Sequence, residues 1–244
     1  MPSRWLITLD GPASSQIPVE APHAVVSGWL DIDHKAPVKP YSLAPPRSVG
    51  GFTALEVRLL DDGLASRLLG GAPSGGRVRL GRHWFTVIAA AALQVRTPWT
   101  DLHRRPPSRA WEVSYLSPTT FRRRTRTSPW PAPDSVLTSL ASRWRAVSPA
   151  TAPKVNQATA RSLWVSDLDG RSETLQLRET IVSGFVGRVR YVCDGSRVEA
   201  AAVDALFAFA EYAGVGSHTA FGLGTATVTP TWQPGQAAVG SRQG

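Results

Sequence analysis

The stretch Ala213-Gly-Val-Gly-Ser-His-Thr-Ala-Phe-Gly-Leu-Gly224 carries two Gly-x-Gly pairs between a predicted helix and a predicted strand. The helix covers residues 197–212 after the capping residue Ser196, and the strand covers residues 225–231. Glycine has no Cβ, so its backbone can take positive φ values and approach another group closely. The order helix, loop, strand is the reverse of a dinucleotide-binding loop, and no Gly-Lys-Ser/Thr of a P-loop is present. The stretch therefore favours the last α-β step of an α+β domain over a nucleotide-cofactor site.

The segments upstream of this helix complete one β-α-β-β-α-β unit, the order of a ferredoxin-like domain. The predicted elements are a strand at 110–116, an amphipathic helix at 134–146, and strands at 163–168, 174–179 and 181–192. We interpret Asp167-x-Asp169-Gly170 as a hairpin turn, because the remaining ligands of a calcium loop are missing. A C-terminal domain is thus expected over residues 110–232. Residues 233–244, rich in Gly, Gln and Ser, are expected to be a disordered tail.

The first 95 residues fit a second copy of the same unit. Predicted strands cover 5–9 and 52–60, predicted helices cover 22–30 and 61–69, and a hairpin is expected from 77–79 and 84–95. Residues 31–46 are polar and proline-rich and are interpreted as a connection. Residues 96–109, rich in Pro and Arg, are interpreted as the linker between domains. We therefore predict an α+β protein with two tandem ferredoxin-like (RRM-like) domains, at 1–95 and 110–232.

The charge of the chain indicates a polyanionic partner. There are 27 Lys and Arg against 18 Asp and Glu, a formal net charge of +9, and the excess is mostly arginine, whose planar guanidinium suits phosphate. Basicity alone does not separate nucleic acid from an anionic membrane surface. No segment approaches the roughly 20 apolar residues of a membrane span, so we expect a cytoplasmic protein with no membrane partner.

The sequence offers little to a metal ion or to a covalent nucleophile. The single cysteine, Cys193, excludes a disulfide framework and a Cys-rich zinc site, and we expect it to be buried. Neither a His-x-x-x-His pattern nor a Gly-x-Ser-x-Gly nucleophile elbow occurs. We predict no metal site and no cofactor.

Residues 121–130 combine positive charge with aromatic side chains. The positions Arg122, Arg123, Arg124 and Arg126 place four arginines within five residues. Such a cluster binds phosphates and releases counterions, although a solvated charged loop is the alternative. Phe121 and Trp130 lie close by and could stack on bases, but core packing is the commoner fate of each.

Three segments, in order along the chain, carry a family resemblance. They are His34-Lys-Ala-Pro-Val-Lys39-Pro-Tyr41-Ser-Leu43, Val113-Ser-Tyr-Leu-Ser-Pro-Thr-Thr-Phe121, and the glycine-rich stretch 213–224. They are similar to the catalytic-histidine stretch, the opening of the second domain, and the C-terminal glycine-rich loop of the CRISPR repeat-processing endoribonucleases (Cas six, RAMP superfamily). The resemblance covers about residues 3 to 232 and implies two ferredoxin-like domains.

The resemblance implies a catalytic site in the first domain. His34 matches the family's general acid/base and Lys39 its lysine, with Lys35 as a substitute because the His-to-Lys spacing is short. The family often adds a tyrosine from the first helix, and residues 22–30 contain none. Tyr41 or Ser42 is therefore expected to fill the third catalytic role.

The resemblance also implies an RNA-binding surface in the second domain. The residues expected to bind RNA are Gly214, Gly216, Ser217, His218, Thr219, Gly222, Gly224, Arg122, Arg123, Arg124 and Arg126. Successive N–H groups of a glycine-rich loop form a concavity suited to phosphate. His218 lies inside this loop and is the rival of His34 for proton transfer.

The implied function is that of a metal-independent endoribonuclease that binds CRISPR repeat RNA and cuts precursor transcripts into guide RNAs. A ribose 2′-OH would attack the adjacent phosphate and leave 2′,3′-cyclic phosphate and 5′-OH ends. Histidine suits both proton transfers, because its unperturbed pKa is about 6.5. The implied partners are repeat, precursor and guide RNA and a CRISPR effector complex, with the protein a monomer or homodimer. The alternatives are a non-catalytic RNA-binding RAMP subunit of such a complex and a basic module for another polyanion.

Overall fold

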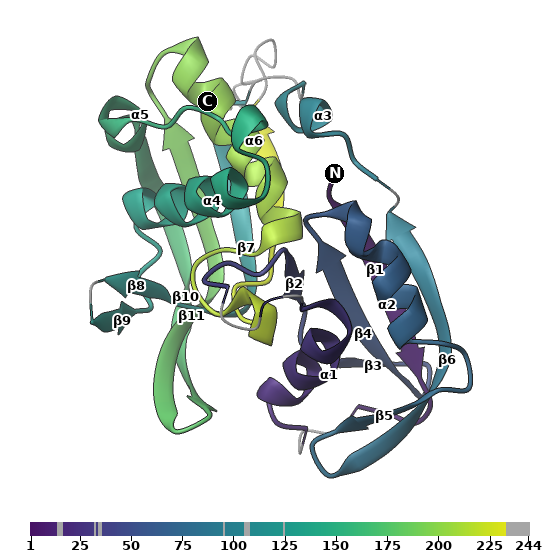
Figure 1. Ribbon diagram of the computed structural model, residues 1–244. Helices are drawn as coiled ribbons and strands as arrows, with labels where there is room; N and C mark the ends of the chain where they lie inside the picture. The colour runs from purple at the N-terminus through teal and green to yellow at the C-terminus, as the bar shows by residue number, and fades with distance from the viewer. Residues whose placement is uncertain are drawn as a thin grey trace, which may run out of the picture.

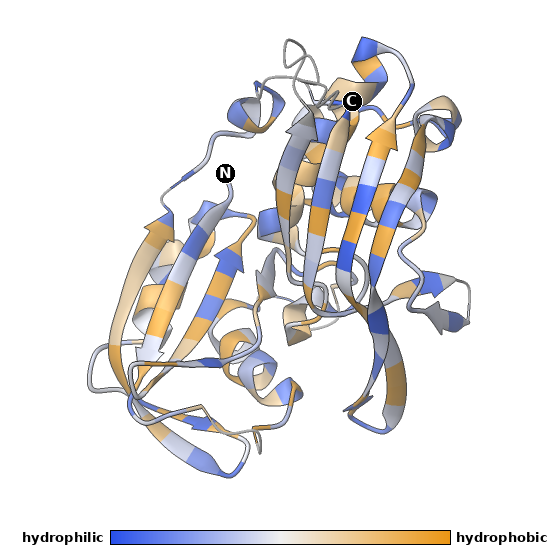
Figure 2. Ribbon diagram, turned by 180° about the vertical axis from the view of Figure 1, so that it is seen from behind, coloured by the Kyte–Doolittle hydropathy of each residue, from blue (hydrophilic) through white to orange (hydrophobic). Residues whose placement is uncertain are grey.

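Two α+β halves lie side by side in the computed structural model, which describes residues 1–13, 17–31, 33, 36–94, 96–104, 108–123 and 125–232 (Figure 1). In each half, helices cover one face of an antiparallel sheet, and the strands form the near face of the molecule when it is turned by 180° (Figure 2). None of the helices in the described ranges is long and apolar enough to cross a membrane. The predicted tail, 233–244, lies outside the described residues.

The first sheet has the strand order β2-β4-β1-β6-β5. Its strands are β1 (Ser3–Leu9), β2 (Tyr41–Leu43), β4 (Phe52–Leu59), β5 (Arg77–Leu80) and β6 (His83–Gln94), and β3 (Arg47–Val49) also pairs with β4. Its helices are α1 (Glu20–Leu30) and α2 (Ala65–Gly71), with a 3₁₀ turn η1 (Asp62–Leu64) before α2. Strand β1 is central, with Ile7 opposite both Leu55 and Ala90. The order is ferredoxin-like, with β5 added at one edge.

The second strand of this unit, β2, lies within residues 31–46, which we had interpreted as a connection, and that interpretation was wrong here. Only three residues long and flanked by Pro40 and Pro45, β2 is too short to show an alternating pattern. It forms because Tyr41 and Leu43 pair with Leu59 and Val57 of β4. Tertiary pairing, rather than local propensity, therefore specifies this strand.

The second sheet has the order β10-β11-β7-β12, the ferredoxin-like arrangement again. Its strands are β7 (Ala110–Thr119), β10 (Leu163–Leu177), β11 (Thr180–Cys193) and β12 (Ala226–Trp232), with helices α4 (Pro133–Val147) and α6 (Arg197–Ala213) on one face. A small hairpin of β8 (Phe121–Arg123) and β9 (Arg126–Ser128) and the short segments α3 (Trp99–His103), η2 (Pro149–Thr151), α5 (Gln157–Ser162) and η3 (Thr219–Phe221) complete the list. The predicted fold class of two tandem ferredoxin-like domains is confirmed.

The interpretation of Asp167-x-Asp169-Gly170 as a turn is wrong, because these residues lie inside β10. The predicted strands 163–168 and 174–179 are one strand, and the turn falls at Arg178 and Glu179. A Cβ on Gly170 would lie 2.5 Å from the Phe185 ring, so this glycine serves close packing between strands.

The core of the second half depends on α6, whose middle is buried on most sides. Its N-terminus is a capping box, in which the Ser196 hydroxyl accepts from the Glu199 N–H and the Glu199 carboxylate accepts from the Ser196 N–H. Trp111 of β7 is fully buried and donates its indole N–H to Asp204 of α6 at 2.6 Å. Cys193 is buried, as predicted.

The glycine-rich loop between α6 and β12 joins the two halves. The Ser42 hydroxyl of β2 donates to the Tyr212 carbonyl at the end of α6, at 2.5 Å, and the Thr225 hydroxyl after the loop donates to the Leu43 carbonyl at 3.3 Å. At the end of the loop, Gly224 has a φ of +68°, and a Cβ there would lie 1.9 Å from the Val215 carbonyl oxygen. No side chain fits at that position without moving the backbone.

The Gly224→Ala substitution should therefore destabilise the protein by more than about 2 kcal/mol, because it adds a steric clash to an unfavourable φ. Thermal or urea unfolding measures the change. The matched control is Gly28→Ala on the exposed side of α1, where an added Cβ meets nothing within 4 Å. That control should leave stability unchanged or raise it by up to about 1 kcal/mol. Equal effects of the two substitutions would contradict the packing argument.

Candidate active site

Three neighbouring cavities lie where the two halves meet. The histidine cavity, about 270 Å³, is lined by His23, Lys39, Arg143, Arg178, His218 and Phe221, among others. The α4 cavity, about 440 Å³, shares Val38 and Arg143 with it. The hairpin cavity, about 720 Å³, lies toward the β8–β9 and β10–β11 hairpins and shares Arg178, His218 and Phe221 with the histidine cavity. Shared walls make the three a continuous groove.

The histidine cavity is lined by four separate segments of the chain besides α4. His23 lies on α1, Lys39 precedes β2, Arg178 forms the tip of the β10–β11 hairpin, and His218 lies in the glycine-rich loop. The first two belong to the first sheet's domain and the last two to the second. Phe221 packs between them, with its ring centroid 4.0 Å from that of His23 and 6.1 Å from that of His218.

Both imidazoles of this cavity favour the neutral form. Burial lowers the pKa of His23 below its usual 6.5, and this effect outweighs the nearby Asp31 carboxylate. Burial also lowers the pKa of His218, and the positive charge of Arg122 adds to the shift. Near pH 7 each ring is therefore mainly neutral, the state in which histidine can accept a proton.

Lys39 is held at the cavity by two oxygens. Its ammonium lies 2.6 Å from a carboxylate oxygen of Asp31 and donates to the Asp33 carbonyl at 3.0 Å. The side chain is mostly buried, so the ion pair is shielded from solvent. A fixed positive charge thus lies beside the two imidazoles.

Tyr41 lies beneath His23 and does not reach the cavity surface. It is fully buried, its hydroxyl oxygen lies 3.5 Å from His23 Nδ1, and burial raises its pKa well above the usual value. A neutral hydroxyl at that place orients the imidazole rather than touching substrate. Ser42, the alternative, is buried and donates to the Tyr212 carbonyl.

His34 and Lys35 lie outside the described residues. The neighbouring residues on either side do border the cavity: the Asp33 carbonyl accepts from Lys39, and Ala36 belongs to the lining.

The N–H groups of the glycine-rich loop are largely used inside the protein. Gly216 donates to the Ser139 hydroxyl, Ser217 to the Thr120 carbonyl, and Gly224 to the Pro118 carbonyl. Gly214 and Gly222 likewise donate to carbonyls, those of Ala210 and Thr219. The phosphate concavity expected from successive glycine N–H groups is therefore not available at these positions. The loop instead places His218, Thr219 and Phe221 in the wall of the histidine cavity.

The arginine cluster lies on the β8–β9 hairpin. The cluster was predicted from the sequence, but the hairpin was not. Arg122 is exposed and lines both the α4 and the hairpin cavities, and Arg126 is exposed at the start of β9. Arg123 contributes its backbone to β8, and Arg124 lies outside the described residues. Phe121 is buried at 3% exposure, whereas Trp130 is 54% exposed and free to stack.

The residues of the histidine cavity that were not predicted as site residues include His23, Arg143, Arg178 and Phe221. Arg143 lies on α4, donates to the Ala213 carbonyl and to the Thr219 hydroxyl, and has its pKa lowered by burial to about 10, so it stays charged near pH 7. Arg178 has a φ of +53° at the hairpin tip, with its guanidinium 5.4 Å from the Phe221 ring centroid. The sequence offered a lone histidine on a predicted helix for His23, whereas Arg178 fell inside the predicted strand 174–179 and carried no such signal.

Across the described part of the chain, no group of three or more His, Cys, Asp or Glu side chains is placed to hold a metal ion.

Known proteins resemble this chain over nearly its whole length. The family model of the CRISPR-associated endoribonuclease Cas6 matches residues 113–226. A CRISPR-associated endoribonuclease Cas6 from Mycobacterium tuberculosis is 26% identical, over 93% of this chain and 78% of its own length. A solved Cas6 product complex is 31% identical, with a TM-score of 0.80 over 93% of this chain and 99% of the other. A Thermus thermophilus Cas6 structure is 26% identical, with a TM-score of 0.73 over 94% of this chain and 98% of the other. The chain belongs to the family of CRISPR-associated Cas6 endoribonucleases.

Proposed function

We propose that this endoribonuclease binds CRISPR repeat RNA in the groove between its domains and cuts precursor transcripts into guide RNAs without a metal ion. One observation carries the proposal. His23 and His218, whose lowered pKa values favour the neutral form, line one cavity with the mostly buried Lys39. Arg143 and Arg178 of the second domain line the same cavity. That set supplies a proton acceptor and fixed positive charge, which are what RNA cleavage by an internal nucleophile needs.

The chemistry is an in-line transesterification. A neutral imidazole takes the proton from the ribose 2′-OH, the 2′ oxygen forms a bond to phosphorus, and the bond from phosphorus to the 5′ oxygen breaks. A protonated group then donates a proton to the leaving 5′ oxygen. The products are a 2′,3′-cyclic phosphate and a 5′-OH, and no water or metal is consumed.

The roles can be distributed over the named residues. His34 remains the proposed general acid/base, since the chain on both sides of it borders the cavity. His23 and His218 are the further candidates for proton transfer. Lys39 would stabilise the charge that develops on the phosphorane, held in place by Asp31. Tyr41 is proposed to orient His23 rather than to touch RNA.

RNA binding is proposed for the second domain's side of the groove. Arg122 and Arg126 on the β8–β9 hairpin would hold backbone phosphates. In the glycine-rich loop, the polar side chains of Ser217, His218 and Thr219 would contact RNA. The proposed RNA-binding part of the loop also includes Gly214, Gly216, Gly222 and Gly224. The 31% identical relative was solved as a product complex. Here we propose that the guide RNA passes to a CRISPR effector complex.

The first test is cleavage of the organism's own repeat RNA in EDTA. Wild type should cut it, and a single 2′-deoxy substitution at the mapped cut site should abolish the cut, because the nucleophile is then missing. His34→Ala should lose cleavage while it retains RNA binding. If His34→Ala still cuts, the proton transfer belongs to His218 or His23. Wild type that binds the repeat and leaves it intact would instead indicate a non-catalytic RNA-binding subunit.

The pH dependence of single-turnover cleavage tests the state of the histidines. If His23 or His218 is the base, its lowered pKa keeps it neutral below pH 6.5, and the acid limb of the rate profile should lie below that pH. If His23 is the base, His23→Asn removes this acid limb and lowers the plateau about 10²- to 10⁴-fold. The matched control is His83→Asn, at the start of β6 and outside the groove, which should keep the wild-type profile. An acid limb above pH 6.5 would exclude both His23 and His218 as the base.

Replacement of Lys39 tests electrostatic stabilisation. Lys39→Met should lower the single-turnover rate about 10²-fold and change RNA affinity by less than about threefold, because the charge acts on the transition state. Lys154→Met, an exposed lysine outside the cavities, is the matched control and should match wild type. A loss of affinity as large as the loss of rate would assign Lys39 to RNA binding instead.

A further inference from the structure

The α4 cavity is larger than the histidine cavity and is not needed for the proton transfers. It holds about 440 Å³, within the range of roughly 300–1,000 Å³ of pockets that enclose small organic ligands. Its walls are the exposed face of α4, the start of the glycine-rich loop and β8, with Val38 from the first domain closing one side. It therefore has room for one nucleotide beside the cavity where cleavage is proposed.

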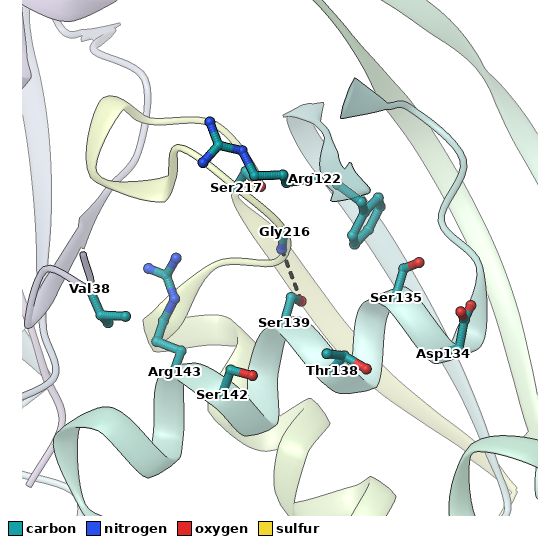
Figure 3. A pocket seen from close by; sticks show the side chains of 11 residues that line it. Val38, Arg122, Asp134, Ser135, Thr138, Ser139, Ser142, Arg143, Gly216 and Ser217 are labelled. Atoms are coloured by element: carbon teal, nitrogen blue, oxygen red, sulfur yellow. Dashed lines mark hydrogen bonds between the residues drawn. The ribbon is translucent and has the colours of Figure 1, made fainter. Parts of the chain in front are cut away.

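The two ends of the α4 cavity differ in chemistry. Figure 3 shows the guanidinium groups of Arg122 and Arg143 at one end, beside the glycine-rich loop, while Ser135 and Thr138 lie toward the other end along α4. Arg143 cannot swing away, because it is hydrogen bonded to the Ala213 carbonyl and the Thr219 hydroxyl. One end thus suits an anion, whereas the other holds the hydroxyls of Ser135 and Thr138 and the carboxylate of Asp134.

The hydroxyl end suits the edge of a nucleobase. Ser135, Thr138 and Ser142 follow one another at intervals of three and four residues, so they lie on one face of the helix. A hydroxyl both donates and accepts hydrogen bonds, as a base edge requires. Val38 at the arginine end and the ring of Phe121, which is only 3% exposed, add apolar surface to the lining. Short side chains along this face keep the cavity open.

The cavity is formed before any ligand arrives. The Ser139 hydroxyl donates to the Val136 carbonyl of its own helix and accepts from the Gly216 N–H, which fixes the loop against α4 (Figure 3). At Gly216 a Cβ would lie 2.3 Å from the Thr120 carbonyl oxygen, so the loop can approach α4 and β7 this closely only with glycine there. A preformed pocket does not lose affinity to ordering its own walls.

We propose that the α4 cavity holds one unpaired nucleotide of the RNA, splayed out of the strand next to the scissile phosphate. Arg122 and Arg143 hold its phosphate, and the hydroxyls of α4 contact its base. The proposal rests on the proposed function, since the cut site would lie in the adjoining histidine cavity. Single-stranded RNA is commonly recognised through bases that leave the stack in this way.

The test pairs pocket variants with RNA that lacks single bases. Repeat RNAs, each with one abasic nucleotide within three positions of the cut site, are compared with intact RNA for affinity and single-turnover rate. For wild type, one abasic position should weaken binding about tenfold, within the range measured for the loss of one well-held base. Thr138→Phe, which fills the cavity, should weaken binding of intact RNA by a similar factor. Its affinity for that abasic RNA should equal the affinity of wild type for the same abasic RNA.

Two further variants keep the result unambiguous. Thr138→Val preserves the volume of the side chain and removes its hydroxyl, so it should lose part of the affinity for intact RNA and none for the abasic RNA. Ala146→Phe adds the same ring to an exposed position of α4 outside the cavity and should behave as wild type.

If Thr138→Phe weakens the binding of intact RNA and of abasic RNA by the same factor, the two losses of affinity are independent. That result would overturn the nucleotide pocket. So would a wild type that tolerates an abasic nucleotide at every position. In both cases cleavage of intact repeat RNA in EDTA would stand, and the proposed function with it. Absence of that cleavage in wild type is the separate result that would remove the proposed function.

Discussion

The close approach of the glycine-rich loop to its neighbours determines where the groove lies. Glycines hold the loop in left-handed conformations, and at Gly216 and Gly224 the backbone lies so close to carbonyl oxygens that no side chain fits. The N–H groups of the loop are satisfied by β7, by α4 and by the loop itself. With the backbone fixed in this way, His218 and Phe221 face α1 of the other domain, and Leu223 packs against Leu177 and Val182 of the long hairpin. Movement of this loop would change all three cavities at once.

The balance of burial and charge gives the groove its chemical character. The imidazoles of His23 and His218 are kept neutral mainly because they are partly buried, while Lys39 stays within an ion pair to Asp31. A neutral base and a positively charged side chain can thus lie close together in the histidine cavity. Arginine, with its very high pKa, remains charged even where burial is extensive, as at Arg143. The excess of arginine over lysine in the composition therefore suits a groove that is only partly open to solvent.

Long periodic elements were predictable from the sequence, and short or paired ones were not. Helices α4 and α6 carry apolar residues at helical spacing, α6 begins at the capping residue Ser196, and both were predicted within a few residues of their ends. Strand β2 escaped because three residues between prolines have no pattern of their own. The groove residues that were predicted as site residues are Lys39, Arg122, Gly216, Ser217, His218 and Thr219. His23 was missed, because only the tertiary contact with Phe221 and Tyr41 distinguishes it from any other helical histidine.

The origin of the cavity residues has a consequence for synthesis of the protein. His23 and Lys39 leave the ribosome early, Arg143 and Arg178 later, and His218 among the last described residues. At about 5–20 residues per second, the N-terminal domain is made well before the loop that completes the groove. A nascent chain therefore lacks the assembled site while it is still held next to its own messenger RNA. Division of the groove between the two domains delays its assembly until the glycine-rich loop of the second domain has been made.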